Sequence, residues 1–497
     1  MLALLTAFSF SSCEKFLDVN TNPNAPVSET LPLSAKLPAA LVSTVNQEIL
    51  QLNQIGGFWG GYWGTTNEGI SMFIDLKTYN GPAIRHQRDG IPVWEKGFNN
   101  LLYYQLIIDQ AESGGFSFYA GIARIMQGWH FLRLVDLYNN IPFDDALKPN
   151  RTTTPVYEEG ETVYKKSIAL ITRGINDIAS AMPGAGPGKD DVLFEGNTLL
   201  WKKFGNTLKL RALIRQSETG NGAYIREQIT IIEQEGSGFL GAGEHALINP
   251  GYLNSNGKLN PFWENYYRNV EGVATANYQD IRPTSFVLEQ YDTRNDPRLQ
   301  RLYVSVNGSF NGVQFGNPDV DPLYSRNQTS AFKGPAENGG AAAGLFKSPT
   351  QDAVLMSSFE SLFLQAEAAQ RNWITTGTTE GFYNQAIRES FSYLGVPAES
   401  LNPYLEQSIV DLNSANNKIG RIIEQKWLAL NSISSIEGWN DFRRLGIPSI
   451  PNSKEYSAAD VFPLRLMYPE TERMTNNENT SKQGNDDMLG APVWWDR

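Results

Sequence analysis

The chain has 497 residues, of which 53 are Asp or Glu and 41 are Lys or Arg, so its formal net charge at pH 7 is −12. This acidity, without any cluster of basic residues, excludes a general nucleic-acid binder, which needs a basic surface to displace counterions. A single cysteine excludes an internal disulfide. Beyond residue 12, no run approaches the roughly 20 apolar residues of a membrane-spanning helix.

The first twelve residues, MLALLTAFSFSS, form a short apolar run that ends at Cys13. Such a run has the length of the apolar part of a signal peptide and is too short to span a bilayer. We interpret residues 1–12 as a lipoprotein signal peptide and Cys13 as the acylated residue, since two acyl chains suffice for stable anchoring. The Asn/Pro-rich residues 13–30 then form a tether. The alternative is a buried N-terminal segment with an incidental thiol.

Helical periodicity dominates the rest of the chain. Apolar residues recur at helical spacing in AGIARIMQGWHFLRLVDLYNNIPF, NTLLWKKFGNTLKLRALIRQS and NKIGRIIEQKWLALN. Residues 353–371 and 379–394 carry two further amphipathic patterns joined by a short loop, and Gly395 ends the second. Two helices joined in this way predict a helix pair of the size found in tetratricopeptide (TPR) repeats, although the TPR consensus itself is not readable.

Between about residues 217 and 350 the chain becomes rich in Asn, Gly and Pro, with interleaved aromatic residues. This composition predicts long ordered loops and short strands, which often carry binding residues on a rigid scaffold. We therefore predict a mostly α protein, a TPR-like helix-pair scaffold with a long loop-rich ligand-binding face. Residues 31–497 are expected to form a single domain that includes this loop-rich insertion.

Recognisable segments follow one another along nearly the whole chain: CEKFLDVNTNPNAP, LPAAL, FLRLVDLYNNIPFDDAL, WKKFGNTLKLRALIRQS, DTRNDPRLQRLY, SLFLQAEAAQRN, IIEQKWLAL, EGWNDFRRLGIP and PLRLMYPETERMTN. Together, in this order, they resemble the SusD/RagB family of bacterial outer-membrane lipoproteins, in particular its SusD-like branch. The resemblance implies a TPR-like scaffold with a loop-rich ligand face, anchored through a lipid on Cys13. It also implies a partner, a SusC-like TonB-dependent β-barrel transporter, over which the protein sits as a hinged lid.

Two aromatic groups are candidates for ligand binding. Trp59, Tyr62 and Trp63 occur among glycines in QIGGFWGGYWGTTNEG. Flat aromatic rings stack on the apolar faces of sugars, and glycines would leave the rings uncovered. The alternative is a tightly packed helix pair in which glycine admits close backbone approach, with the rings partly in the core.

The second group lies in the loop-rich region, in NPFWENYYRNVEGVATANYQD. Aromatic platforms beside amide and guanidinium donors suit a polyhydroxylated ligand or a peptide backbone. The alternative is a loop that packs its own aromatics onto the scaffold. Tyr324, in DPLYSRN, is expected to border the same cleft. The predicted ligand-binding residues of this region are Trp263, Asn265, Tyr266, Tyr267, Arg268, Tyr278 and Tyr324.

Catalytic and metal-binding patterns are weak. His86, His130 and His245 lack metal-ligand spacing, and His130, in an apolar helix, is expected to be a satisfied core residue. The segment DVNTNPNAPVSE begins like a calcium-binding EF-hand loop, but Pro23 stands where the loop needs glycine. The charges of EGWNDFRRLG and EQKW predict a buried Arg–carboxylate network. A glycosidase carboxylate pair is not excluded by sequence, but we expect no enzyme, no cofactor and no metal.

The expected function is capture of oligosaccharide nutrients at the cell surface and their delivery to the transporter, without chemistry. The protein is expected to face the cell exterior and to meet the membrane only through its lipid. One alternative keeps this role with peptides as ligands. Another is a structural subunit of an outer-membrane assembly that has lost its ligand, and an outright hydrolase is the least favoured.

Overall fold

Helices form most of the structure, a computed structural model that describes residues 31–148, 152–318, 320–456 and 461–496. Successive helices pack as pairs, so the prediction of a mostly α, TPR-like scaffold is confirmed. The predicted signal peptide, Cys13 and the tether lie outside the described residues.

A first block of helices is centred on α6. Helix α6 packs against α5, α7 and α8, and nearly all of its side chains are buried. Glycine permits the closest approach, since a Cβ on Gly121 of α6 would lie 2.6 Å from the backbone oxygen of Gly174 in α7. A helix covered on all sides belongs in the centre of a core. The block consists of α5 (Val93–Gly114), α6 (Ser117–Tyr138), α7 (Gly160–Ala179), α8 (Thr198–Arg215) and α9 (Gly222–Glu235).

A second block follows in the last third of the chain and contacts α8 through α14. The helix predicted over 353–371 begins later, because Ala353–Met356 forms strand β6 with a partner distant in sequence. Ser357 caps α14 by accepting a hydrogen bond from the backbone N–H of Glu360. Gly395 ends α15 with φ 70°, as its position predicts. The block consists of α14 (Ser358–Gln370), α15 (Thr379–Leu394), α17 (Lys418–Leu430) and α18 (Ser435–Leu445).

The N-terminal helical segment joins the two blocks. It consists of α1 (Leu33–Gln47), the π-helical turn η2 (Glu48–Leu52) and α2 (Asn53–Trp59). Helix α1 packs on α5, and α2 packs on α18. Glu48 points into the core, where it accepts hydrogen bonds from Trp129 Nε1 at 2.7 Å and Arg133 Nε at 3.0 Å. π-Helical turns occur frequently at functional sites.

Buried charges pair where α6, α8, α14 and α18 meet. Glu437 of α18 contacts Arg133 and accepts a hydrogen bond from Arg215 Nη2 at 2.5 Å. Burial acts to raise the pKa of Glu437, but Arg215 and Arg133 lower it well below its usual range. Arg444 pairs with Glu367 at 2.6 Å. The predicted Arg–carboxylate network is confirmed as a structural feature of the core.

Short elements joined by long loops lie between α9 and α14. The loop-rich region that was predicted to begin at about residue 217 begins only after α9. In this helix, Ile225, Ile229 and Ile232 form a buried stripe. The elements are α10 (Pro261–Tyr266), α11 (Ala276–Asp280), α12 (Ser285–Asp292), α13 (Leu299–Leu302), η3 (Pro322–Tyr324) and η4 (Pro335–Glu337).

The described strands form three small antiparallel sheets. β1 (Trp63–Thr65) pairs with β5 (Ile281–Pro283), β2 (Ile141–Pro142) with β3 (Tyr157–Glu158), and β4 (Ala246–Ile248) with β6 (Ala353–Met356). The first sheet, with Trp63 opposite Pro283, ties the end of α2 to the loop-rich region.

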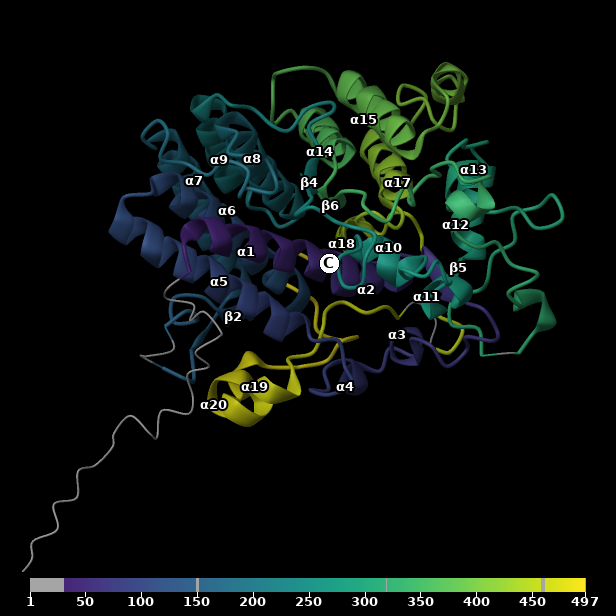
Figure 1. Cartoon of the computed structure of the whole chain (residues 1–497), viewed down its shortest axis with the longest axis horizontal. Helices are drawn as coiled ribbons and strands as arrows, with labels where there is room; N and C mark the ends of the chain where they lie inside the picture. Colours follow the sequence, from purple (N-terminus) through teal and green to yellow (C-terminus); the bar gives the residue numbers. More distant parts are fainter. Residues whose placement is uncertain (1–30, 149–151, 319, 457–460, 497) are drawn as a thin grey trace, which may run out of the picture.

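Figure 1 shows the α5–α9 block on one side, α11–α13 on the other, and α1 and α2 between them. Within the described ranges, no helix combines the length and apolarity that crossing a membrane requires. The remaining short helices are α3 (Ile74–Lys77), α4 (Gly81–Ile84), η5 (Ala398–Ser400), α16 (Leu401–Leu405), α19 (Glu470–Thr475), α20 (Asn477–Thr480) and η6 (Ser481–Gln483).

Candidate functional site

The first predicted aromatic group lies in the core. Trp59, Tyr62 and Trp63 are at most 3 % exposed. Tyr62 stacks on Trp427 with ring centroids 4.6 Å apart and donates a hydrogen bond to the backbone oxygen of the same residue. Trp63 donates from Nε1 to Ser432 Oγ at 2.8 Å. The expectation that these ring faces are uncovered is therefore wrong.

The glycines beside these rings explain the difference. A Cβ on Gly57 would lie 2.4 Å from the indole ring of Trp63, and a Cβ on Gly56 would lie 2.1 Å from the backbone nitrogen of Ile436 in α18. The glycines therefore bring α2 against its neighbours instead of exposing the aromatic rings.

The second predicted aromatic group is also packed on itself. Trp263, Tyr266, Tyr267 and Tyr278 are at most 8 % exposed. The ring of Tyr267 stacks on Phe346 with centroids 4.8 Å apart, while the rings of Trp263 and Tyr278 meet it edge-on. The expectation of an open aromatic platform is wrong here as well, because the loop folds its rings inward.

The polar predicted residues of this region are half-buried. Arg268 donates to the backbone oxygen of Gly272 at 2.7 Å and to Glu337 Oε1 at 3.3 Å, which holds the loop closed. Asn265 lies beside these rings, on α10. Tyr324 is partly exposed and borders a cavity. Ligand contact by these residues stays a prediction.

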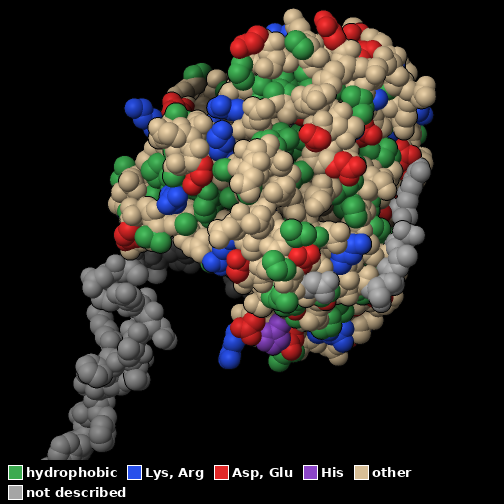
Figure 2. Space-filling view, turned by 90° about the vertical axis from the view of Figure 1, so that its right-hand side faces the viewer, with side chains coloured by type: hydrophobic (Ala, Val, Ile, Leu, Met, Phe, Trp, Pro, Cys, Tyr) green, Lys and Arg blue, Asp and Glu red, His purple; other side chains and the backbone are tan. Residues whose placement is uncertain are grey.

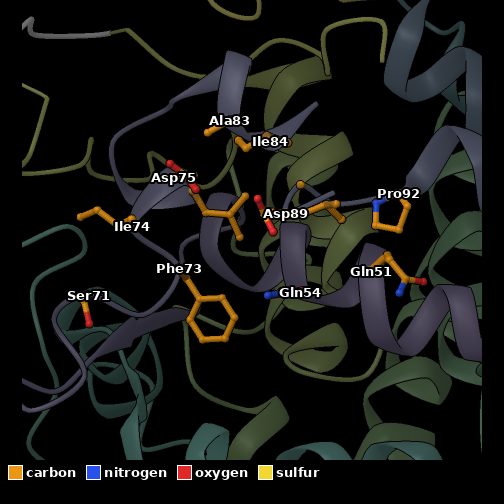
Figure 3. A pocket seen from close by; sticks show the side chains of 13 residues that line it. Gln51, Gln54, Ser71, Phe73, Ile74, Asp75, Ala83, Ile84, Asp89 and Pro92 are labelled. Atoms are coloured by element: carbon orange, nitrogen blue, oxygen red, sulfur yellow. The ribbon is translucent and has the colours of Figure 1, made fainter. Parts of the chain in front are cut away.

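A cavity of about 420 Å³ lies between the η2–α2 helix and the loops that carry α3 and α4 (Figure 3). We call it the glutamine pocket, after Gln51 and Gln54. Its volume falls within the range of about 300–1,000 Å³ that is usual for ligand sites. Its lining residues are Gln51, Gln54, Ser71, Phe73, Ile74, Asp75, Leu76, Ala83, Ile84, Asp89, Gly90, Ile91 and Pro92.

The helical wall of the pocket presents two amides. Gln51 lies in the π-helical turn and Gln54 at the start of α2, and both are partly exposed. Neither amide forms a hydrogen bond with another described side chain or backbone group. Because an amide both donates and accepts, this wall is suited to hydroxyl groups.

The opposite wall presents the ring of Phe73 (Figure 3). Phe73 precedes α3 with a left-handed backbone, φ 55°, which is uncommon for a bulky residue. Its half-buried ring lies against Phe58, with centroids 4.8 Å apart. Such strained conformations cost about 1–3 kcal/mol and concentrate at functional sites.

Three hydrogen bonds hold the loop that carries Phe73. Trp59, predicted as a ligand residue, donates from Nε1 to the backbone oxygen of Leu76 at 3.0 Å. Lys77 donates to Ile70 O at 2.5 Å and to Thr65 Oγ1 at 3.0 Å. Burial lowers the pKa of Lys77 to about 8. The buried residues thus position the wall of the pocket.

Carboxylates and a hydroxyl complete the lining. Asp75 accepts a hydrogen bond from Asn80 Nδ2 at 3.0 Å, and Asp89 lies 3.8 Å from His86 Nδ1. None of the described residues that line the pocket is Lys, Arg or His. Donors, acceptors and an aromatic ring without a paired nucleophile and base are suited to binding rather than to catalysis. In the described part of the chain, no cluster of three or more His, Asp or Glu side chains is placed to hold a metal.

Sequence reasoning missed the glutamine pocket. Gln51 and Gln54 occur in an ordinary helical pattern, which carries no sign of a π-helical turn. Phe73 lies between Met72 and Ile74 in EGISMFIDLK, so the local sequence gives no sign that its ring lines a cavity. His130 behaves as predicted, buried and bonded through Nε2 to Thr44 Oγ1 at 2.9 Å.

A comparison with models of known protein families finds a match over most of the chain. The family model SusD-like_2, described as "Starch-binding associating with outer membrane", matches residues 33–469. The chain belongs to the SusD-like family. This confirms the resemblance seen in the sequence, and it supports the expectation that the protein is not an enzyme, since the family is carbohydrate-binding. A comparison with curated protein sequences finds no match.

Solved structures share the fold. A SusD homolog from Bacteroides uniformis has 23 % identity and a TM-score of 0.71, over 93 % of this chain and 99 % of that one. A SusD homolog from Bacteroides thetaiotaomicron has 20 % identity and a TM-score of 0.74, over 94 % and 99 %. A chitin-binding SusD homolog from Flavobacterium johnsoniae has 21 % identity and a TM-score of 0.73, over 93 % and 98 %.

Proposed function

We propose that this SusD-like protein captures neutral oligosaccharides at the cell surface, in the glutamine pocket, and passes them to a TonB-dependent transporter. The observation that carries the proposal is the pairing of the Phe73 ring with the two unbonded amides of Gln51 and Gln54. A family described as starch-binding and outer-membrane-associated supports the ligand class and the location.

The chemistry of the pocket matches a sugar. The ring of Phe73 offers a flat apolar surface to the C–H face of a pyranose, while amides and carboxylates exchange hydrogen bonds with its hydroxyls. Asp75 and Asp89 disfavour sulfated or uronic glycans, because no cationic side chain in the lining offsets them. A neutral glycan is therefore the preferred ligand.

The wider setting of the proposal follows from the sequence. Acylation at Cys13 would hold the protein at the outer membrane, facing outward, through residues 13–30. The transporter is the SusC-like barrel that the family resemblance implies, and closing onto it would deliver the glycan.

The test is calorimetric titration of the purified full chain with maltohexaose and with the hexamer of N-acetylglucosamine. We expect Phe73→Leu to weaken binding of a glycan that the wild type binds by about 2- to 13-fold, because stacking on an aromatic ring contributes roughly 0.5–1.5 kcal/mol. Leucine keeps the bulk against Phe58, so the fold is retained.

The matched control is Phe116→Leu, since Phe116 is 40 % exposed on the turn between α5 and α6, away from the pocket lining. The Phe116→Leu variant is expected to bind the same glycan with the affinity of the wild type. Equal affinities in the Phe73 and Phe116 variants would refute the assigned pocket. If the wild type binds neither glycan but binds peptides, the proposal that its ligand is an oligosaccharide is refuted.

A further inference from the structure

A second cavity, of about 960 Å³, lies between α12 and the loop segments over residues 308–312 and 323–328. We call it the α12 cavity. Figure 2 views this side of the molecule, where several Asp and Glu side chains lie. Tyr324, a residue predicted to bind ligand, is part of its lining.

The α12 cavity carries unbalanced negative charge. Glu289 and Asp292 stand one helical turn apart on α12, so they share a face, and both are exposed. Neither forms an ion pair with another described residue, whereas Asp296 is paired with Arg298 at 2.6 Å. The described lining contains no Lys, Arg or His.

The other walls are apolar and amide-bearing. Phe310 is half-buried and Leu323 is 69 % exposed, and together they form an apolar surface beside Tyr324. The side-chain amides of Asn295 and Gln300 form no hydrogen bond with other described residues. An apolar surface with free amides matches a sugar ring as well as the glutamine pocket does.

We propose that the α12 cavity binds a glycan that carries protonated amino groups, such as an oligomer of glucosamine. An ammonium group has three donors and no acceptor, so it pairs with the free carboxylates of Glu289 and Asp292. In the glutamine pocket, by contrast, Asp75 accepts a hydrogen bond and Asp89 faces His86. The inference rests on the proposed function in that the ligand is a glycan.

The experiment compares the glucosamine hexamer with the N-acetylglucosamine hexamer by calorimetry of the full chain at low salt. In the double variant Glu289→Gln/Asp292→Asn, affinity for the glucosamine hexamer is expected to fall by about 2- to 30-fold, the range of two exposed ion pairs. Affinity for the acetylated hexamer stays unchanged. Added salt weakens only the glucosamine interaction of the wild type.

A matched double variant, Glu227→Gln/Glu233→Gln, removes two exposed carboxylates from α9 and so changes the net charge equally. Its affinity for the glucosamine hexamer is expected to match that of the wild type. An equal loss in both double variants would overturn the site, and tighter binding of a lysine peptide would overturn the ligand class. Neutral-glycan binding that depends on Phe73, without any effect of Glu289 and Asp292, would overturn this inference alone.

Discussion

Individual residues in this protein often act through a neighbour. Trp59 is 3 % exposed and its ring lies against Trp439, with centroids 5.1 Å apart. Its Nε1 nevertheless donates a hydrogen bond to the backbone oxygen of Leu76, which lines the glutamine pocket. A buried tryptophan combines a large apolar area with one donor that needs a partner. Trp59, predicted as a ligand residue, therefore supports the wall of the pocket, and the smaller Phe73 lines the cavity.

Stability should depend on pH through His130. Burial, together with the neighbouring charge of Arg133, lowers the pKa of His130 to about 3. Below about pH 6.5 the unfolded chain binds a proton that folded His130 does not, so stability falls by roughly 1.4 kcal/mol per pH unit, or about 2 kcal/mol between pH 6.5 and 5. This contribution is complete above pH 6.5 and is lost as the pH falls toward 3.

The measurement is urea unfolding at pH 7 and at pH 5. The His130→Gln variant should lose less stability than the wild type over this interval, by about 2 kcal/mol. His86→Gln, at an exposed histidine, should keep the wild-type dependence. If the His130→Gln variant loses as much free energy of unfolding as the wild type between pH 7 and pH 5, groups other than His130 cause that loss.

At the scale of elements, close helix contacts and one irregular turn shape the site. The π-helical turn η2 carries Glu48 into the core and Gln51 to the pocket within a single turn. Helix α2 then meets α18 through glycine. In a regular α-helix, Glu48 and Gln51 would project at a different angle to each other. The π-helical turn therefore helps to place Gln51 in the lining of the glutamine pocket.

Replacing Gly56 with Ala should destabilise the protein by at least about 1–3 kcal/mol, the usual cost of overpacking. The added Cβ would lie 2.1 Å from the backbone nitrogen of Ile436, which cannot move without shifting α18. Thermal unfolding measures the effect. Gly222→Ala is the matched control, since its Cβ meets only Arg226 Nη1 at 3.4 Å and should be neutral. Equal midpoints for both variants would contradict the close contact.

For the whole molecule, the buried charge network and the two cavities lie in different parts of the structure. The buried ion pairs around Glu437 join α6, α8 and α18, whereas the cavities lie beside α3, α4 and α12. Loops placed on a rigid scaffold keep their cavities while varying their lining.

The membrane partner can be identified by gentle-detergent purification of the tagged chain from native membranes. Mass spectrometry should recover one TonB-dependent β-barrel together with a glycan. A Cys13→Ser variant, which lacks the thiol that we propose is acylated, should be lost from the membrane fraction. A larger assembly without barrel or glycan would refute transport and favour a structural subunit.

The sequence by itself determined the family, the helical scaffold and the buried charge network. These features depend on helical periodicity and on the order of segments, both of which can be read from neighbouring residues in the chain. The start of α14 was misplaced, since β6 depends on a strand far away in sequence. Only the tertiary structure decided which aromatics face solvent. The sequence around Trp63 and Trp263 is of the kind that could form an aromatic platform for a sugar. Whether a ring is buried, however, depends on which residues pack over it. Residues distant in the chain cover both rings, such as Ser432 at Trp63 and Phe346 at Trp263. For the same reason Gln51, Gln54 and Phe73 form a pocket only when folding brings the π-helical turn against the α3 loop.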